Sequence, residues 1–562
     1  MKVGIIVCGI VIALIVIGAA DRYFKGKELR KKLALQFAGP VKNMMSAKRL
    51  ASLGAYRDSL FSRIYDIDSI TWNDLELDRV FAELNRTQSA VGEEYLYASL
   101  FRPEFSDNEL TRRERLISLF SENEALRNEV LVALARLGKI RDVSLYQYLT
   151  SFEGVQSDGY FRHLIPILGY LGAVASAFLY PDKPTITIFL VIFAAGYSIV
   201  SYFKRKSEIE PYLRAMTFVS NWVGAVDTMS RSVRAKDTPL ADELEVMRET
   251  ARGFSSFRRG TYLLVSESAG DVAQLLLDYV RMLTHVDLIK FNRMCGILKE
   301  KKSDLERLFE DTGRIDMAMA IASYRAYRAG EWCLPELSQE DDAVLEFTDL
   351  THPMIAGAVP NSLRAERSVL LTGSNASGKS TFLKTVAINA LLAQTIHTVL
   401  GKAYKGKYYR ILSSMALRDD LAAKESYYIV EIRSLKRILD AAEEEEPVLC
   451  FVDEVLRGTN TAERIAASGR ILRYLAASGA LCFAATHDLE LTDYLRDCFE
   501  MKHFSETVTE ESLTFDYTLK DGKATSRNAI RLLRLFGYPE EIVDQADRDA
   551  VAFLARNGGQ EA

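Results

Sequence analysis

Residues 371–381 read Leu-Thr-Gly-Ser-Asn-Ala-Ser-Gly-Lys-Ser-Thr, and this stretch decides the fold of the C-terminal part of the chain. Gly373 to Ser380 fits the pattern G-x-x-x-x-G-K-S. It follows an apolar run, Val369 to Thr372, and opens a predicted helix from Thr381 to Ile396. In that context the backbone N–H groups and the helix N-terminus surround a phosphate group. The stretch therefore predicts a phosphate-binding loop between a strand and a helix.

The loop residues have distinct predicted roles in holding ATP and Mg²⁺. We expect Lys379 to reach the β- and γ-phosphates and to take part in catalysis, and Ser380 to ligate Mg²⁺. The residues expected to bind the nucleotide are Gly373, Ser374, Asn375, Ala376, Ser377, Gly378, Lys379, Ser380 and Thr381.

Two more compact apolar runs, 448–452 and 481–485, end at polar residues. We expect Asp453 to hold Mg²⁺, Glu454 to polarise the attacking water, and His487 to contact the γ-phosphate or that water. In isolation, an Asp-Glu pair is typical of a solvated strand end, and a lone His is more often structural. The order of the three elements along the chain favours the catalytic interpretation.

The spacing of apolar and polar residues divides the chain into a region that predicts alternating strands and helices and a region that predicts helices alone. Short apolar runs alternating with helices are typical of buried parallel strands, so residues 336–562 predict an α/β ATPase domain. Residues 51–160 and 207–335 are rich in Leu, Glu and Arg at helical spacing and predict a mostly α-helical region.

Composition excludes several classes of protein. Of 562 residues, 48% are hydrophobic and 26% charged, which is typical of a globular chain and not of a collagen-like or disordered one. The net charge of −5 gives no global basic bias for nucleic acid, although a local basic patch stays open. The six cysteines form no C-x-x-C pair, which argues against a zinc ribbon or a disulfide scaffold and fits a reducing compartment.

Three uncharged apolar segments predict helices that span a membrane. They are Val3 to Ala20, Leu164 to Tyr180 and Ile186 to Phe203, and the last two are joined by a polar loop at 181–185. Eighteen helical residues extend about 27 Å, close to the thickness of a bilayer core. We therefore predict a transmembrane helix at 1–20 and a transmembrane hairpin at 161–206. The first segment could instead be a signal peptide, and the hairpin two buried helices of a soluble core.

Positive charge predicts the orientation of these segments. Residues 21–50, a basic juxtamembrane linker, hold nine basic residues against two acidic ones, and Lys204-Arg-Lys206 follows the third segment. Because basic flanks stay on the cytoplasmic side, we expect the ATPase domain at the cytoplasmic face of the plasma membrane. The linker could also bind anionic lipid or nucleic acid, but topology alone accounts for it.

The motifs around the phosphate loop resemble those of the MutS mismatch-repair ATPases. The loop itself is similar to theirs, including Asn375. Three further segments match the family patterns D-E-x-x-R-G-T-x-T, A-T-H-x-x-E-L-T, and D-D-L followed by S-T-F-M-x-E-M: Phe451 to Thr461, Phe483 to Thr492, and Arg418 to Ile432. Weaker matches occur at Leu350 to Pro353, at Tyr517 to Leu533, and in Thr87-x-x-x-x-Gly92-Glu-Glu, which is similar to the start of the family's helical core or lever domain.

The resemblance implies a fold, a partner and a ligand. The fold is a P-loop ATPase domain of the ABC type preceded by a helical lever region, here with transmembrane helices. In the family two ATPase domains dimerise, so Ser426 would reach the nucleotide of the partner subunit; its alternative role is a helix N-cap. DNA that is mismatched, damaged or branched is the implied ligand, with a link to DNA repair or recombination.

Departures from the family pattern leave two other functions open. Mismatch sensors carry two domains ahead of the lever, whereas we expect only the basic linker at 21–50 between the first apolar segment and the lever here. Phe-x-Glu triplets at residues 81, 120 and 504 are interpreted as chance. The membrane segments favour an ABC-like membrane ATPase acting on a lipid or solute, although no L-S-G-G-Q motif occurs. A scaffold whose ATPase switches a protein partner is the third possibility.

Overall fold

The computed structural model describes most of the chain in two compact units. The described residues are 24–41, 45–140, 143–152, 160–233, 238–261, 272–340, 344–374, 377–415, 427–456, 459–508, 513–524 and 529–557. Unit 1 comprises Met1–Phe61, Leu84–Ala98 and Glu114–Tyr327, and unit 2 comprises Ser62–Glu83, Ser99–Arg113 and Arg328–Ala562. The predicted transmembrane helix at 1–20 lies outside the described residues, and the domain bounds drawn from the sequence stay predictions.

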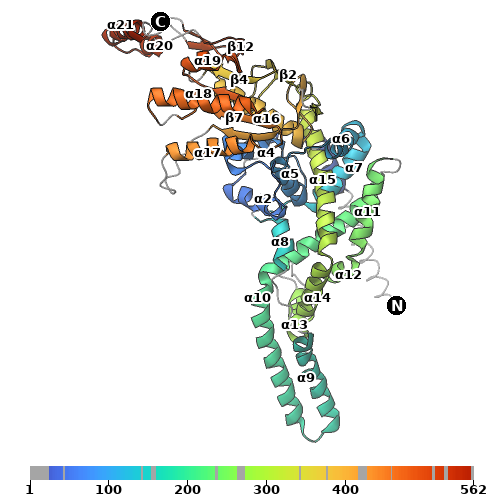
Figure 1. Cartoon of the computed structure of the whole chain (residues 1–562). Coiled ribbons are helices and arrows are strands. Elements are labelled where there is room, and N and C mark those ends of the chain that lie inside the picture. The colour runs from blue at the N-terminus through green and yellow to red at the C-terminus, as the bar shows by residue number, and fades with distance from the viewer. Residues whose placement is uncertain are drawn as a thin grey trace. The chain divides into compact units, whose positions relative to one another are not determined.

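The described part of the chain up to Tyr327 is helical (Figure 1). Residues 24–36 form a first helix. The helices that follow are α2 (Ala47–Ser59), α3 (Ser69–Asp74), α4 (Leu77–Leu84), α5 (Ala90–Phe101), α6 (Asp107–Glu122), α7 (Glu124–Leu137), α8 (Leu145–Ser151), α9 (Tyr160–Leu179), α10 (Pro184–Ser232), α11 (Leu240–Arg252), α12 (Ser255–Arg258), α13 (Val272–Thr284), α14 (Val286–Glu300) and α15 (Lys302–Tyr327).

The C-terminal part alternates strands and helices, as the sequence predicts. Its strands are β1 (Glu336–Ser338), β2 (Leu345–Leu350), β3 (Asn361–Ala365), β4 (Ser368–Thr372), β5 (Ala403–Lys407), β6 (Arg410–Ser414), β7 (Val448–Asp453), β8 (Leu481–Ala485), β9 (Phe499–His503), β10 (Glu506–Val508), β11 (Leu513–Phe515) and β12 (Lys520–Asp521). Its helices are α16 (Lys379–Thr395), α17 (Tyr427–Ala441), α18 (Thr461–Ala477), α19 (Glu490–Leu495), α20 (Ala529–Leu535) and α21 (Glu540–Asn557).

A six-stranded sheet in the order β12-β9-β4-β8-β7-β6 organises unit 2. All neighbours pair in parallel except β12, which is antiparallel to β9. The three predicted strands β4, β7 and β8 are adjacent in the centre of this sheet, so their carboxyl ends meet at one edge. A second sheet, β1-β5-β2-β3, is mostly antiparallel.

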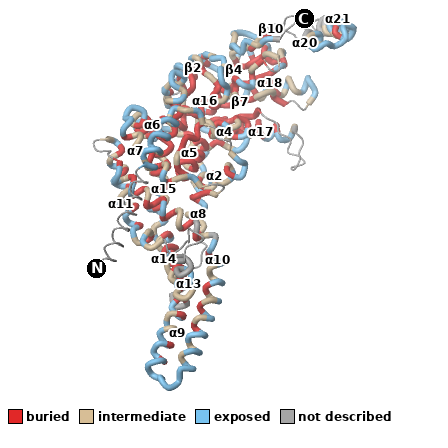
Figure 2. The backbone as a smooth tube through the Cα atoms, turned by 180° about the vertical axis from the view of Figure 1, so that it is seen from behind, coloured by how far each residue is buried: buried red, intermediate tan, exposed pale blue. Residues whose placement is uncertain are grey.

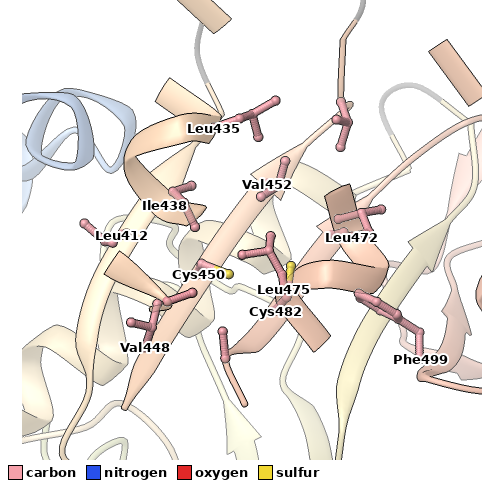
Figure 3. Close-up of a cluster of buried hydrophobic side chains, with 14 of the residues drawn as sticks. Leu412, Leu435, Ile438, Val448, Cys450, Val452, Leu472, Leu475, Cys482 and Phe499 are labelled. Carbon is pink, nitrogen blue, oxygen red and sulfur yellow. The ribbon is translucent and has the colours of Figure 1, made fainter. Parts of the chain in front are cut away.

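The core of unit 2 lies between the sheet and helices α17 and α18. Figure 3 shows Leu435 and Ile438 of α17 and Leu475 of α18 in this cluster. Cys450 and Cys482, paired in register on β7 and β8, are fully buried in the same layer. Alternate strand residues face opposite sides of a sheet, and the central strands β4, β7 and β8 are nearly continuous buried runs because both sides of the sheet are covered there.

An N-terminal segment covers the β6 edge of the sheet within unit 2. Helix α3 packs on β6, where Ser413 N donates to Thr71 Oγ1 at 3.1 Å and Met415 N donates to Asp74 Oδ2 at 2.9 Å. The Ser413 hydroxyl also donates to Asp74, at 2.7 Å. Because an edge strand exposes unpaired N–H groups, these side chains complete its hydrogen bonding and block edge-to-edge association.

The Thr87-to-Glu94 motif marks a close helix crossing inside unit 1. The buried carboxylate of Asp316, on α15, accepts hydrogen bonds from the backbone N–H groups of Gln88 and Ser89 and from the Ser89 hydroxyl at 2.6–2.9 Å. A Cβ atom on Gly92 would lie 2.2 Å from Asp316 Oδ2. Glycine is therefore required by the approach of α15, and Asp316 fixes Ser89, whose hydroxyl accepts a hydrogen bond from Gly92 N in the first turn of α5.

Replacing Gly92 by Ala is expected to lower the free energy of unfolding of unit 1 by about 3 kcal/mol, because Asp316 must move and give up charge-assisted hydrogen bonds. Gly296→Ala is the matched control, since a Cβ atom there meets nothing within 4 Å. Thermal unfolding of the detergent-solubilised chain should show a lower midpoint for Gly92→Ala only. Equal midpoints for the two variants would contradict the close crossing.

Helices α9 and α10 form the predicted hairpin. They pack along each other, with Gly169 close enough to Ala194 that an added Cβ would lie 3.0 Å from the alanine Cβ, and with Ser176 Oγ 2.9 Å from Thr187 Oγ1. Small residues and an interhelical hydroxyl pair are typical of helices that associate in lipid. Helix α10 continues without a break to Ser232, so it joins the hairpin directly to the rest of unit 1 (Figure 1).

The hairpin surface is apolar and exposed (Figure 2). Among the described residues, the segment 184–210 is the one helix long and apolar enough to cross a bilayer, with a mean hydropathy of 2.0; the apolar part of α9, 163–179, is shorter. Phe178 and Ile192 are 83% and 66% exposed. A core helix buries such side chains, whereas these are exposed in the part of the chain that the structure describes.

A buried polar cluster fastens the base of the hairpin to α14. Nδ1 of His163 lies 3.3 Å from Nδ1 of His285, whose Nε2 is 3.0 Å from the Ser198 carbonyl oxygen. Lys206 donates to the buried Asp287 carboxylate at 2.8 Å. These contacts link α9, α10 and α14, so a displacement of the hairpin base must disturb the helices that follow it.

Candidate nucleotide-binding and hydrolysis site

The loop between β4 and α16 has the conformation of a phosphate-binding loop. Gly373 and Gly378 have φ angles of +141° and +107°, a backbone conformation that residues with a side chain rarely adopt. In addition, a Cβ atom on Gly373 would lie 2.6 Å from the Phe504 carbonyl oxygen. Lys379 Nζ donates to the carbonyl oxygens of Gly373 and Ser374 at 2.7 and 2.8 Å. The ammonium therefore lies across the loop, as the sequence predicts for a group that binds phosphates.

Two predicted Mg²⁺ ligands are brought together from opposite ends of the site. The Ser380 hydroxyl, on the first turn of α16, donates to Asp453 Oδ2 at the end of β7, at 2.5 Å. Mg²⁺ prefers one or two protein oxygens, with phosphate and water oxygens completing its octahedron. The two oxygens beside a phosphate loop fit that ion. The buried Ser377 hydroxyl in the loop has no hydrogen-bond partner among the described residues, which fits a phosphate oxygen.

Glu454 occupies a strained turn directly after β7. Its φ is +58°, as is that of Leu456, and both are non-glycine residues. The turn is fixed because Glu454 N donates to the Ala485 carbonyl at 2.9 Å and Leu456 N donates to the buried carboxylate of Glu431 on α17. Strain held by surrounding contacts is typical of a functional position.

Glu454 and His487 are neighbours, as the strand order predicts. His487 Nδ1 lies 3.4 Å from Glu454 Oε1, and the imidazole is about half exposed. The next residue, Asp488, accepts two hydrogen bonds from Arg464 of α18, at 2.9 and 2.7 Å. This bidentate pair raises the pKa of Arg464 and fixes the backbone that carries His487.

A pocket of about 350 Å³ adjoins the phosphate loop within unit 2. Gly378 and Thr381 of the loop form one wall, and Phe382 and Phe504, with ring centroids 5.6 Å apart, form another. Tyr517 also lines it, 3.1 Å from where a Cβ on Gly378 would lie. An apolar and aromatic pocket beside a phosphate loop suits a nucleotide base.

His352, in the weakly matching segment Leu350 to Pro353, lies in this pocket and is buried. Burial, together with the nearby Lys384 ammonium, lowers the pKa of His352 to about 4. The ring is therefore neutral at neutral pH. Its Nδ1 accepts a hydrogen bond from Met354 N at 3.2 Å, which fixes the ring beside the base pocket.

Phe504 and Glu506 are site residues that the sequence did not reveal. Glu506 accepts a hydrogen bond from the Ser374 hydroxyl at 2.9 Å, and the Phe504 N–H donates to the Thr372 carbonyl at 3.0 Å. In the sequence their triplet follows the ATPase core and is therefore interpreted as a chance match. No motif marks them, since only the pairing of β9 with β4 brings this segment to the loop.

Tyr517→Ala is expected to weaken ATP affinity about tenfold, because one aromatic–base contact contributes about 1–3 kcal/mol, while the catalytic rate at saturating ATP stays within about twofold. Tyr538→Ala, an exposed tyrosine outside the pocket, is the matched control. Equilibrium ATP binding measures the difference. Equal ATP affinities of the Tyr517 and Tyr538 variants would show that Tyr517 makes no contact with the bound nucleotide base.

Three predicted site residues cannot be placed. Asn375 and Ala376 lie outside the described residues, as does the whole segment 416–426, which contains Ser426. The structure brings together the other predicted loop, metal and catalytic residues of one chain.

The six-stranded, mostly parallel sheet, the glycine loop and the acidic strand end define a P-loop nucleotide-binding domain. Residues 369–553 match the family model for MutS domain V. Curated relatives include the DNA mismatch repair protein MutS of Natronomonas pharaonis, 29% identical over 48% of this chain and 32% of that protein. MutS of Pseudothermotoga lettingae is 31% identical over 46% and 32%, and MutS 1 of Halobacterium salinarum 33% over 44% and 30%. Residues 369–553 of this chain are therefore similar to domain V of the MutS family.

The matched region spans about a third of the length of these relatives. The family model begins at residue 369, so all of unit 1, including the hairpin, lies outside it.

Proposed function

We propose that the chain is a MutS-like ATPase held at the cytoplasmic face of the plasma membrane, where ATP hydrolysis controls its binding to mismatched, damaged or branched DNA. The observation that carries the proposal is the convergence, in one described site, of Lys379, the Ser380–Asp453 pair and the Glu454–His487 pair. These are the group types that bind a nucleoside triphosphate and activate a water.

Each side chain has a defined task in the proposed hydrolysis. Lys379 binds the β- and γ-phosphates. Ser380 and Asp453 would hold Mg²⁺, which neutralises phosphate charge when bound. Glu454 accepts a proton from the attacking water, and His487 holds that water or the γ-phosphate by a hydrogen bond. Dimerisation through the ATPase domains, with Ser426 reaching the partner's nucleotide, completes the proposal.

DNA as the ligand rests on the names of the relatives, each called a DNA mismatch repair protein. The family model matches only the ATPase domain of this chain. DNA binding by this chain is therefore proposed. Membrane attachment rests on the exposed apolar hairpin, whose large side chains need lipid or a partner to cover them.

The same hairpin favours a second function, an ABC-like membrane ATPase or conformational scaffold acting on a lipid, a solute or a protein. ATP turnover of the chain in lipid vesicles, measured with and without DNA, separates the two. Turnover that changes with DNA supports the MutS-like function. Turnover that responds to lipid or solute and is indifferent to DNA supports the second.

A further inference from the structure

Unit 1 contains a cavity of about 800 Å³ that the proposed function does not use. It lies among the helix at 24–36, α7, the C-terminal part of α10 and the segment at α12. All of its lining residues belong to unit 1, whereas the nucleotide site belongs to unit 2. We call it the arginine cavity, after Arg30, Arg136 and Arg258.

The charge of the arginine cavity is positive. The three arginines come from three different elements, and Glu129 is the one acidic residue in the lining that the structure describes. Arg30 and Arg136 are exposed, so the cavity presents two guanidinium groups to solvent. A cavity with an excess of two positive charges attracts a ligand with two or more negative charges.

Arg258 is seated by the backbone of α10. A Cβ on Gly224 would lie 2.8 Å from Arg258 Nη2, so the guanidinium lies against the helix where a side chain is missing. Asp227 accepts hydrogen bonds from both Arg258 and Arg231, at 3.0 and 2.7 Å. Two positive guanidinium groups share one negative carboxylate, so this wall keeps a net positive charge. Each guanidinium has five N–H donors, and a single carboxylate cannot accept all of them.

The remaining wall is polar and small. Ser220, Asn221 and Thr261 line it, and the Ser220 and Thr261 hydroxyl oxygens are 2.8 Å apart. The described lining holds no aromatic side chain, so a base has nothing to stack on. Arginine forks and hydroxyl groups match the oxygens of phosphate groups, and the volume exceeds that of a single phosphate.

We propose that the arginine cavity binds a soluble compound that carries two or more phosphate groups. A phosphate could also come from a lipid headgroup. Ser220 lies seventeen residues beyond Phe203, where the third apolar segment ends, which is about 26 Å along α10. A headgroup at the end of that segment would therefore not reach the cavity without leaving the bilayer surface.

Inorganic tripolyphosphate is the probe, titrated calorimetrically into the full chain in detergent. Binding should persist in Lys379→Ala, where the phosphate loop is impaired, and should weaken at least tenfold in Arg136→Gln, which corresponds to about 1.4 kcal/mol. Arg30→Gln should act in the same direction. Arg252→Gln, an exposed arginine of α11 outside the cavity, is the matched control and should bind as the unsubstituted chain does.

Two results would overturn the proposal. Equal affinities in Arg136→Gln and Arg252→Gln would show that the arginine cavity does not hold the probe, and complete loss of binding in Lys379→Ala would place it at the phosphate loop. A water-soluble short-chain phosphatidic acid provides the lipid arm. Tighter binding of that lipid than of tripolyphosphate, with the same dependence on Arg136, would contradict a soluble ligand.

Discussion

Glu454→Gln is expected to retain ATP binding and to lose ATP turnover by about 10²–10⁴-fold, the usual contribution of a general base. The amide keeps the shape of the side chain in its strained turn but cannot accept the proton of the attacking water. Because Glu454 N remains bonded to the Ala485 carbonyl, the turn itself should persist. Steady-state phosphate release and equilibrium ATP binding, measured on the same preparation, separate the two effects.

Glu445→Gln is the matched control, since Glu445 is an exposed carboxylate of the same domain. Its turnover should equal that of the unsubstituted chain. If Glu454→Gln also turned over normally, another residue would have to activate the water. His487, 3.4 Å from Glu454, would then be the first residue to test.

Lys379→Ala is expected to weaken ATP binding by about 100-fold or more. Each charge-assisted hydrogen bond to a phosphate contributes about 1.5–3 kcal/mol, and the ammonium can make more than one. The substitution also removes two donors that now satisfy the Gly373 and Ser374 carbonyl oxygens, so the loop loses part of its own support. Calorimetric titration with ATP in the presence of Mg²⁺ measures the loss.

Lys405→Ala, an exposed lysine on β5 whose nearest carboxylate is that of Glu336 at 3.7 Å, should leave ATP affinity unchanged. This control separates a local effect from a general loss of positive charge. If Lys379→Ala bound ATP as tightly as Lys405→Ala, Lys379 would not contribute to nucleotide binding.

The sequence predicts the centre of unit 2 because each signal there is local. The strands at 369–372, 448–452 and 481–485 are short apolar runs with polar ends, and parallel pairing places their ends together without further information. Asp453, Glu454 and His487 were therefore predictable from position alone. The hairpin was also predictable, because continuous apolar segments on both sides of a Pro-bounded loop need no tertiary context.

Contacts between distant segments were not predictable. Asp74 and Thr71 cover β6 from more than 300 positions away, and their sequence reads as part of an ordinary helical region. Arg49 belongs to the basic linker attributed to topology, yet it is buried and pairs with Glu93. In each case a polar residue is fixed by a partner that no local pattern identifies.

The binding of DNA with and without ATP tests the central claim most directly. The detergent-solubilised chain is titrated into homoduplex, mismatched and branched DNA of equal length, at one fixed salt concentration because phosphate contacts make affinity salt-dependent. We expect binding to at least one of these DNAs with an affinity that changes when ATP is added, and a loss of that change in Lys379→Ala. Failure to bind any of the three, with or without ATP, would contradict it.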